Sequence, residues 1–404
     1  MLREHSFVFG LEYCDLPTML SNVSTMLRIL SLNIDGRNNE RIPIRNIILT
    51  ALLSILYVYS YIISGYWFLF LRDGDLANLT DKFISFSLFV TSAIKLMNKY
   101  LAFDASVPKG SRYSSNMLKS LRYVKRRGIV YWLVLMVNSV VFVSKPLVTP
   151  GRHLFVDSYA IYGLEPVLES PNYEIATLIC ILSVVFICYL VANVTCLLTL
   201  ILGYNEAQML SLGVEMTHLW DDYPDEIYLT KKQPVLRSTL RVERVKERLV
   251  NIIKTHATTR SLLSEIEELL SGLNVIVFGL LIIGLIGELL GGLENTVLQL
   301  PFTLLLLGVD CYLSQKLIDS NEAFDRAVYA CNWEMFNKSN RKIVLVILQN
   351  SQKTMALSAG GMATLSFTCF MSIITKVKAP ITEVVKIGSY YGGISIFEFY
   401  SCLS

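Results

Sequence analysis

The sequence predicts an all-α, polytopic membrane protein with seven transmembrane helices, a cytoplasmic N-terminus and an extracellular C-terminus. Three observations lead to this fold class. Hydrophobic residues make up 53% of the 404 residues, charged residues only 17%, and the mean hydropathy is +0.49. Seven stretches are apolar over the length, about 20 residues, that a helix needs to cross the hydrocarbon core of a bilayer. Lys and Arg are concentrated in alternate connections, which orients the chain.

The predicted spans follow one another with polar segments between them. They cover residues 47–71, 83–103, 129–148, 175–202, 273–290 and 297–318, and the last begins near Met362. The second is the weakest, because it carries Lys95 and Lys99. The chain therefore divides into a cytoplasmic N-terminal segment (1–46), helices one to four with an outer ligand pocket (47–202), a cytoplasmic helical connection (203–271), helices five and six (272–318), a cytoplasmic anchor helix region (319–355), a pore-lining helix seven (356–387) and an extracellular tail (388–404).

Basic residues give the direction of the spans. The N-terminal segment and the connections after spans two, four and six are rich in Lys and Arg, whereas the connection after span three carries only Arg152. By the positive-inside rule the basic side is cytoplasmic. A miscounted span is the alternative that would reverse the orientation. The sequon Asn78-Leu79-Thr80 then falls in the first outer loop, which predicts a glycan on Asn78.

The connection after span four has the pattern of an amphipathic helix. Apolar residues recur at steps of three and four through Leu240, Val245, Leu249 and Ile252 among charges of both signs. This helix is expected to continue into span five. The extensions of spans four to seven are expected to pack together in the cytosol, with residues 343–348 as a second apolar stripe. A solvated connector is the alternative.

The outer half of the first four spans is rich in apolar and aromatic residues with few hydroxyl and amide groups. A pocket for a small apolar molecule has such a lining, in which a few polar groups fix the orientation of the ligand. Lipid-facing or core positions would have the same composition. The Pro-rich connection 146–174 is long enough to form a lid. The predicted ligand-binding residues are Phe83, Phe86, Val90, Leu135, Asn138, Ser139, Phe142, Tyr173, Ile179, Ser183 and Phe186.

The last span carries a polar stripe. Thr375, Lys378, Thr382 and Lys386 are spaced at three, four and four, so they share one helix face. Charged side chains within a membrane helix are costly unless they face water or a partner. A helix that is apolar on most sides and wet along one stripe suits the wall of a pore. We therefore predict that this helix lines an ion path.

Catalytic and metal-binding patterns are missing from the sequence. It has no CxxC or Cys/His metal spacing, no Gly-rich phosphate loop, and its four histidines lie in different segments. The eight cysteines do not form a disulfide framework in the predicted outer loops. We therefore expect no enzymatic activity, no cofactor, no metal and no nucleic-acid partner, with membrane lipid as the surroundings.

A set of C-terminal residues occurs in a fixed order: Cys311-Tyr312, Ser320, Ala327-Val328-Tyr329, Trp333, Arg341-Lys342, Gln352-Lys353, the run 357–361 (Leu-Ser-Ala-Gly-Gly), Leu365 and Phe370. This set resembles the C-terminal pattern of insect odorant receptors, the seven-span family of chemosensory cation channels. The resemblance covers the topology of essentially the whole chain and is sharpest in the last hundred residues. His256, before span five, also resembles a family position. The sequence departs from the family at residues 379–384, where it reads Ala-Pro-Ile-Thr-Glu-Val.

The resemblance implies a tetrameric, non-selective cation channel opened by an odorant, in the plasma membrane of sensory neurons. It implies a heterotetramer with the shared coreceptor subunit, in which this chain is odour-tuned because its connection between spans four and five is short. It implies a gate at Glu383, Lys386 and Ile387, beside the stripe residues Lys378 and Thr382. A gustatory-type chemoreceptor channel, a G-protein-coupled receptor and a secondary transporter are the alternatives.

Overall fold

The computed structural model describes residues 10, 13–37, 41–63, 79–148, 151–154, 161–220, 222, 234–290 and 299–376. Within these, the side chains of residues 61–63, 79–91, 147, 234–240, 287 and 289–290 lie outside the description. The described chain is almost entirely helical. Its elements are α1 (Leu16–Ile29), α2 (Ile44–Tyr57), the π-helical turn η1 (Val58–Ile63), α4 (Leu79–Ser106), α5 (Arg112–Val148), α6 (Asn172–Thr217), α7 (Pro234–Leu290), α9 (Gln299–Tyr329), the 3₁₀ turn η2 (Trp333–Met335), α10 (Lys338–Ser351), β1 (Ser358–Ala359), β2 (Ala363–Thr364) and a short helix, Phe367–Lys376.

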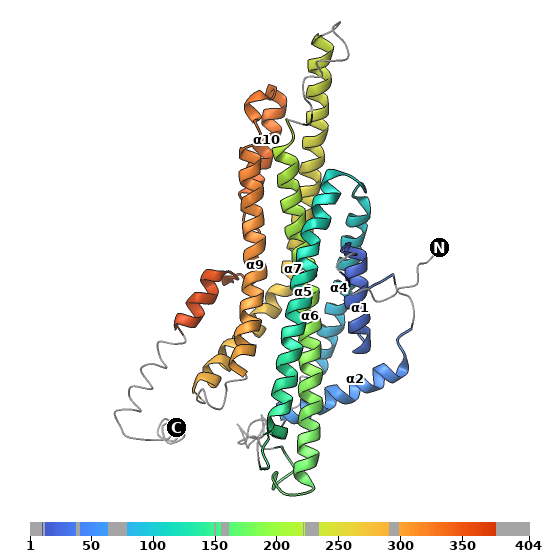
Figure 1. The fold of residues 1–404 in the computed structure, drawn as a ribbon, viewed down its shortest axis with the longest axis vertical. Coiled ribbons are helices and arrows are strands. Elements are labelled where there is room, and N and C mark those ends of the chain that lie inside the picture. Colours follow the sequence, from blue (N-terminus) through green and yellow to red (C-terminus); the bar gives the residue numbers. More distant parts are fainter. Residues whose placement is uncertain are drawn as a thin grey trace, which may run out of the picture.

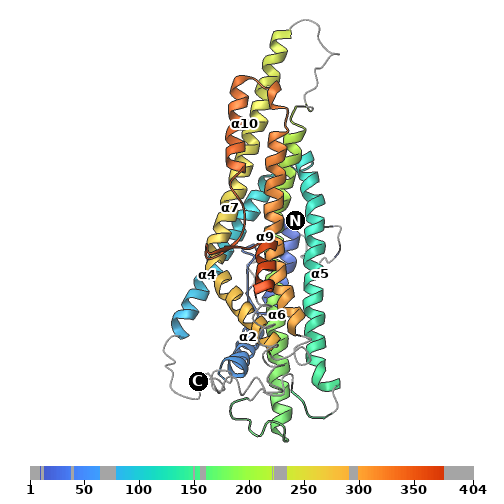
Figure 2. The same ribbon diagram turned by 90° about the vertical axis from the view of Figure 1, so that its left-hand side faces the viewer.

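The helices form an elongated bundle built on the α5–α6 pair. These two long helices run side by side through most of the molecule, and α7, α9 and α10 gather at one end of it (Figure 1, Figure 2). The α2 helix packs on α6 towards the opposite end. We call the end that contains α10 the anchor end and the end that contains the connection between α5 and α6 the outer end. These names follow the predicted orientation.

Three described helices are long and apolar enough to cross a membrane: Arg112–Pro146, Asn172–Thr217 and Arg241–Ile286. They overlap the predicted spans three, four and five, and span four lies entirely within its helix. The first predicted span overlaps a shorter apolar helix, Ile44–Ser60. The second falls within α4, and the sixth overlaps α9. The chain is thus a mostly helical membrane protein, while the count of seven spans and the direction of the termini remain predictions.

The α7 helix continues without interruption from Pro234 to Leu290, which confirms the predicted continuity between the amphipathic segment and span five. Its buried positions include Val245, Leu249 and Ile252, the residues that define the apolar stripe. They join one large core with the ends of α6 and α9, in which Phe324 is fully buried. Helix α10 adds Val344 and Ile347, so the predicted second stripe is buried in part, whereas its Leu345 and Val346 are exposed.

A cluster of four charges joins three helices at the anchor end. The Arg112 guanidinium of α5 donates to both Glu215 carboxylate oxygens, at 2.8 and 3.1 Å, and to both Asp222 oxygens, at 2.6 and 2.7 Å. Arg248 of α7 donates to the same two carboxylates. Because each carboxylate accepts from two guanidinium groups, α5, α7 and the end of α6 are held in one register.

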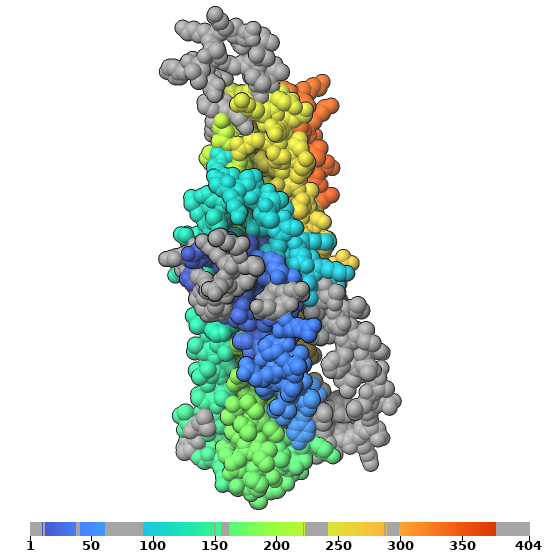
Figure 3. Space-filling model, turned by 90° about the vertical axis from the view of Figure 1, so that its right-hand side faces the viewer, coloured from blue at the N-terminus to red at the C-terminus, as the bar shows by residue number. Residues whose placement is uncertain are grey.

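Helix α1 lies in the segment 1–46, for which the sequence analysis predicts no helix. Asp15 caps this helix, because its Oδ2 accepts a hydrogen bond from Thr18 N at 3.2 Å, and a proline follows in the first turn. Leu16, Leu20 and Leu27 are buried against the core. Figure 3 shows the N-terminal helices, in blue, lying against α5 and α6, in teal and green.

The helix before the predicted gate begins later than expected. Residues near Met362 do not start a helix; they belong to a hairpin in which Ser358 pairs with Thr364 and Ala359 with Ala363. Gly360 and Gly361 form its turn with φ values of +59° and +70°, which side chains other than glycine rarely adopt. The last helix therefore starts at Phe367.

Candidate functional site

Four predicted ligand-binding residues converge inside the bundle. Leu135 and Ser139 of α5 and Ser183 and Phe186 of α6 are all buried, at 1%, 3%, 0% and 8% exposure. The Ser139 hydroxyl hydrogen-bonds with the thiol of Cys188 on α6. Because α5 and α6 are both rich in apolar residues here, these hydroxyl groups lie in mostly apolar surroundings.

A third hydroxyl group comes from the π-helical turn after α2. Ser60 Oγ lies 3.1 Å from Ser183 Oγ, and both residues are fully buried. Single π turns within helices often occur at functional sites, because the extra residue redirects side chains. The turn thus brings α2 and α6 together at a predicted ligand-binding residue, and sequence reasoning did not predict it.

The remaining described members of the set lie nearer the outer end. Phe142 and Tyr173 pack on a small core of Leu154, Ile161, Ala176 and Cys180. Tyr173 Oη donates to the His153 carbonyl at 3.3 Å, and the Arg152 guanidinium lies 5.7 Å from the Tyr173 ring centroid. The described part of the connection between α5 and α6 therefore packs against these aromatic rings, and its role as a lid stays a prediction. Asn138 and Ile179 are half-buried on the same two helices.

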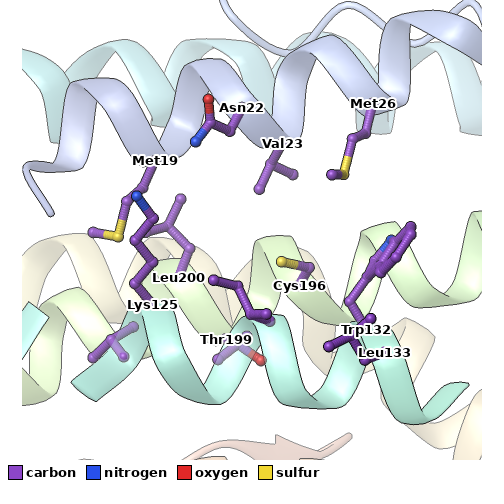
Figure 4. A pocket seen from close by; sticks show the side chains of 13 residues that line it. Met19, Asn22, Val23, Met26, Lys125, Trp132, Leu133, Cys196, Thr199 and Leu200 are labelled. Carbon is purple, nitrogen blue, oxygen red and sulfur yellow. The ribbon is translucent and has the colours of Figure 1, made fainter. Parts of the chain in front are cut away.

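A separate apolar cavity of about 210 Å³ lies between α1, α5 and α6 (Figure 4). It extends from Met19 and Lys125 at one end to Met26 and Trp132 at the other. None of the predicted ligand-binding residues lines it, and it lies nearer the anchor end than they do. Its lining residues are Met19, Asn22, Val23, Met26, Val124, Lys125, Gly128, Ile129, Trp132, Leu133, Cys196, Thr199 and Leu200.

The absence of a side chain at Gly128 keeps this cavity open, and hydrogen bonds from Lys125 and Thr199 to backbone carbonyls keep its lining apolar. A Cβ atom at Gly128 would lie 3.4 Å from Cys196 Sγ, so any larger residue at 128 would occupy the space. The Lys125 ammonium group is hydrogen-bonded to the backbone, because Nζ donates to the carbonyls of Gly10 and Tyr13 at 2.6 and 2.7 Å. Thr199 Oγ1 donates to the Thr195 carbonyl of its own helix. An apolar cavity of this kind accepts apolar molecules.

A sequence model of the family described as "7tm Odorant receptor" matches residues 75–376. The chain belongs to this odorant receptor family. Two solved structures of the insect olfactory receptor OR5 from Machilis hrabei share the fold, one of them in complex with eugenol. The TM-scores are 0.63 and 0.66 in that order, and in both cases the sequence identity is 14%, with 92% of this chain and 98% of the other covered. A search of the curated proteins finds no match.

Membership of the odorant receptor family confirms the resemblance and makes the chain an odorant-binding receptor, not an enzyme. In the described residues no group of three or more His, Cys, Asp or Glu side chains is arranged to hold a metal. The buried His256 stacks on Phe324, with ring centroids 5.0 Å apart, so its surroundings are those of a packing residue.

The Leu-Ser-Ala-Gly-Gly run of the odorant receptor pattern docks the hairpin on α7 and α9. Gly360 N donates to the Ser271 carbonyl at 3.1 Å, and Asn274 Nδ2 donates to the Ser358 carbonyl, also at 3.1 Å. Leu357 N donates to Ser314 Oγ at 3.0 Å. The hairpin thus ties the last helix to two helices of the anchor end.

Some predicted residues fall outside the described part of the receptor. These are the side chains of Phe83, Phe86 and Val90, the glycosylation site Asn78, and the pore and gate residues Lys378, Thr382, Glu383, Lys386 and Ile387.

Proposed function

We propose that this receptor is the odour-tuned subunit of a ligand-gated, non-selective cation channel in the plasma membrane of sensory neurons. It has seven spans, a cytoplasmic N-terminus and an extracellular C-terminus, and it acts in a heterotetramer with the shared coreceptor. The observation that carries this proposal is the family match over residues 75–376. The basic residues placed at the anchor end, including Arg112 and Arg248, support the orientation.

The odorant occupies the outer end between α2, α4, α5 and α6. The buried hydroxyl groups of Ser60, Ser139 and Ser183 support this placement, because a few polar groups in an apolar lining fix the orientation of a small ligand. Phe142 and Tyr173 close the site under the connection between α5 and α6. The proposed lining also includes Phe83, Phe86, Val90, Leu135, Asn138, Ile179 and Phe186.

Ligand binding shifts an equilibrium that already exists between closed and open states. A ligand can do this only through a higher affinity for the open state. Burial of a ligand of about ten carbons contributes about 0.8 kcal/mol per CH₂ group, which is enough to move a poised equilibrium by orders of magnitude. Helix α9 is the connection to the pore, because it packs on α6 and its Tyr312 contacts Phe367 of the last helix at 5.9 Å between ring centroids.

The last helix lines the ion path, and its outer gate lies at Glu383, Lys386 and Ile387. Four copies of Lys386 would place a ring of positive charge around the pore and oppose the passage of cations. One or two copies beside neutral coreceptor residues are tolerable. The chain therefore conducts poorly as a homotetramer.

Whole-cell current recording with a panel of apolar volatiles, eugenol among them, tests this proposal. Cells that express this chain together with the coreceptor are compared with cells that express either chain alone. We expect a cation current evoked by at least one volatile above the coreceptor background, and little current from this chain alone. A robust odorant-evoked current from this chain alone would contradict the heteromeric assignment.

A gustatory-type chemoreceptor channel, a G-protein-coupled receptor and a secondary transporter are the competing functions. A current evoked by soluble tastants in place of volatiles would identify a gustatory-type channel. The second requires an extracellular N-terminus, which protease protection of epitope-tagged termini detects. The third would show substrate accumulation without a channel-like current.

A further inference from the structure

A second cavity, of about 470 Å³, lies on the opposite face of α5 from the apolar cavity, between α5, α6 and α9. Its lining contains three cations, Arg126, Arg127 and Lys316, and one carboxylate, Glu206. Tyr123, Tyr131 and Tyr312 add three phenol groups. A cavity in which cations and hydroxyl groups outnumber acids is suited to an anion with several oxygen acceptors.

The position of this cavity along α5 relates it to the membrane surface. Residues 119–127 contain five Lys or Arg, no acidic residue lies between Asp104 and Asp157, and the apolar part of the span begins at Ile129. Clusters of basic residues directly beside a membrane helix on its cytoplasmic side attract anionic lipid headgroups. The apolar side chain of Val130, which also lines the cavity, is 48% exposed and leads from the basic part towards the lipid-facing surface of α5.

Of the cations in this cavity, Lys316 has a weakly held partner, and Arg127 belongs to a mostly buried ion pair. Lys316 Nζ is 3.5 Å from Asp319 Oδ2 in a half-exposed pair, which contributes little to stability. Arg127 pairs with Glu206. Both cations also lie over the Tyr312 ring, Arg127 Cζ at 5.8 Å and Lys316 Nζ at 5.6 Å from its centroid. A phosphate group would offer each cation a stronger partner than the ring.

Tyr312 connects the cavity to the last helix. Its ring lies 5.9 Å from that of Phe367, the first residue of this helix, and Gln315 Oε1 accepts a hydrogen bond from Phe367 N at 3.3 Å. A ligand that draws Arg127 and Lys316 away from Tyr312 would therefore alter the contact that positions the start of the pore-lining segment.

We propose that this cavity binds the phosphorylated headgroup of an inner-leaflet phosphoinositide, and that the bound lipid sets the sensitivity of the channel to odorant. The acyl chains follow the exposed apolar surface of α5 that begins at Val130. The inner-leaflet placement rests on the proposed membrane orientation, and the effect on sensitivity rests on the proposed channel function. Binding of the lipid by itself requires neither.

Native mass spectrometry of the purified full-length receptor tests the binding. The probes are dioctanoyl phosphatidylinositol 4,5-bisphosphate, dioctanoyl phosphatidylcholine and free inositol trisphosphate. The test variant is Arg126→Gln with Lys316→Gln, and the matched control is Lys119→Gln with Arg122→Gln, which removes two cations of the same segment that do not line the cavity. We expect the phosphoinositide to bind in preference to phosphatidylcholine, and the test variant to bind it roughly thirtyfold more weakly.

Two results would overturn the assignment. An equal loss of binding in both double variants would mean that the lipid recognises net charge and not this cavity. Tighter binding of free inositol trisphosphate than of the lipid would identify a site for a soluble polyphosphate. Because the readout is lipid binding, a failure of the odorant-evoked current leaves this result unaffected, and the two proposals fail separately.

A current recording tests the regulatory part. We expect enzymatic depletion of the phosphoinositide to shift the odorant concentration for half-maximal current in the native receptor by at least about threefold, and to leave the cavity variant unshifted. An identical shift in both would show that the lipid acts elsewhere.

Discussion

The two ends of the bundle use apolar residues in opposite ways. At the outer end, α5 turns valines outward, as with Val137 at 59% and Val140 at 65% exposure, and only 17% of its most apolar stretch is buried. At the anchor end, Phe324, Leu212 and Met216 are almost completely buried, and charges gather in ion pairs between helices. The proposed membrane topology accounts for this difference, because it places lipid around the outer end and water around the anchor end. Lipid covers an apolar exterior at no cost, whereas water at the anchor end makes apolar burial favourable.

The largest expected effect comes from emptying the anchor core. Phe324→Ala removes a fully buried ring that also stacks on His256, and should lower the free energy of unfolding by about 3–5 kcal/mol. The matched change at the outer end, Val140→Ala, should stay within about 0.5 kcal/mol, because this side chain faces outward. Thermal unfolding of the purified receptor, followed by size-exclusion chromatography, measures both. Equal losses of unfolding free energy in Phe324→Ala and Val140→Ala would contradict the proposed difference between the two ends.

The second prediction concerns the hairpin that joins the anchor end to the last helix. Both glycines of its turn have positive φ, so replacement of either by alanine costs about 1 kcal/mol. A Cβ at Gly360 would also lie 2.5 Å from Val275 Cγ2, while the same atom at Gly361 meets nothing within 4 Å. Gly360→Ala should therefore destabilise by about 1–3 kcal/mol more than Gly361→Ala in the same unfolding assay. Similar values for both variants would mean that close packing on α7 is unimportant.

The third prediction is a pH dependence at the anchor end. The Arg112 hydrogen bonds lower the pKa of Asp222, with added attraction from Arg248 and His218. A carboxyl with a lowered folded-state pKa stabilises the fold above its unfolded value of about 3.9, and this stabilisation is lost as pH falls through the folded value. The native chain should thus exceed Asp222→Asn in stability by a constant amount above about pH 5, and the gap should close in acid. A gap that widens in acid would contradict the ion-pair geometry.

The smallest expected effect is on the apolar cavity between α1, α5 and α6. Cys196→Leu adds hydrocarbon to it and should raise the free energy of unfolding by about 0.5–1 kcal/mol. Odorant potency should be unchanged, because the proposed odorant site lies nearer the outer end. Ser183→Ala is the comparison, and it should shift potency about two- to tenfold through the lost hydroxyl group. Lost potency in Cys196→Leu alone would move the odorant site to this cavity.

Much of the helical framework followed from periodicity and apolar length. The steps of three and four through Val245, Leu249 and Ile252 were enough to predict α7, because an amphipathic pattern of that length has few other solutions. The same spacing through Leu16, Leu20, Val23 and Leu27, after the capping Asp15, was a usable signal for α1 that the net polarity of the segment obscured.

The candidate sites were less accessible to sequence reasoning than the helices. The apolar cavity depends on a missing side chain at Gly128 and on α1 docking from more than a hundred residues away. The Ser60–Ser183 pair depends on a π turn, which leaves no clear mark in the residue pattern. The hairpin was readable in principle, since two adjacent glycines such as Gly360 and Gly361 favour a chain reversal. The apolar residues that follow, from Met362 onward, favoured a membrane span at the same place and obscured this signal.

The central claim is that cations pass along the last helix when odorant binds, and thiol modification at Lys386 tests it most directly. Lys386→Cys is co-expressed with the coreceptor, and a cationic methanethiosulfonate reagent is applied outside the cell during odorant exposure, with the native chain as control for its own cysteines. We predict that the reagent alters the odorant-evoked cation current of the variant and not of the native chain. An introduced thiol that reacts fully without any change in current, or that never reacts while the channel conducts, would contradict the account.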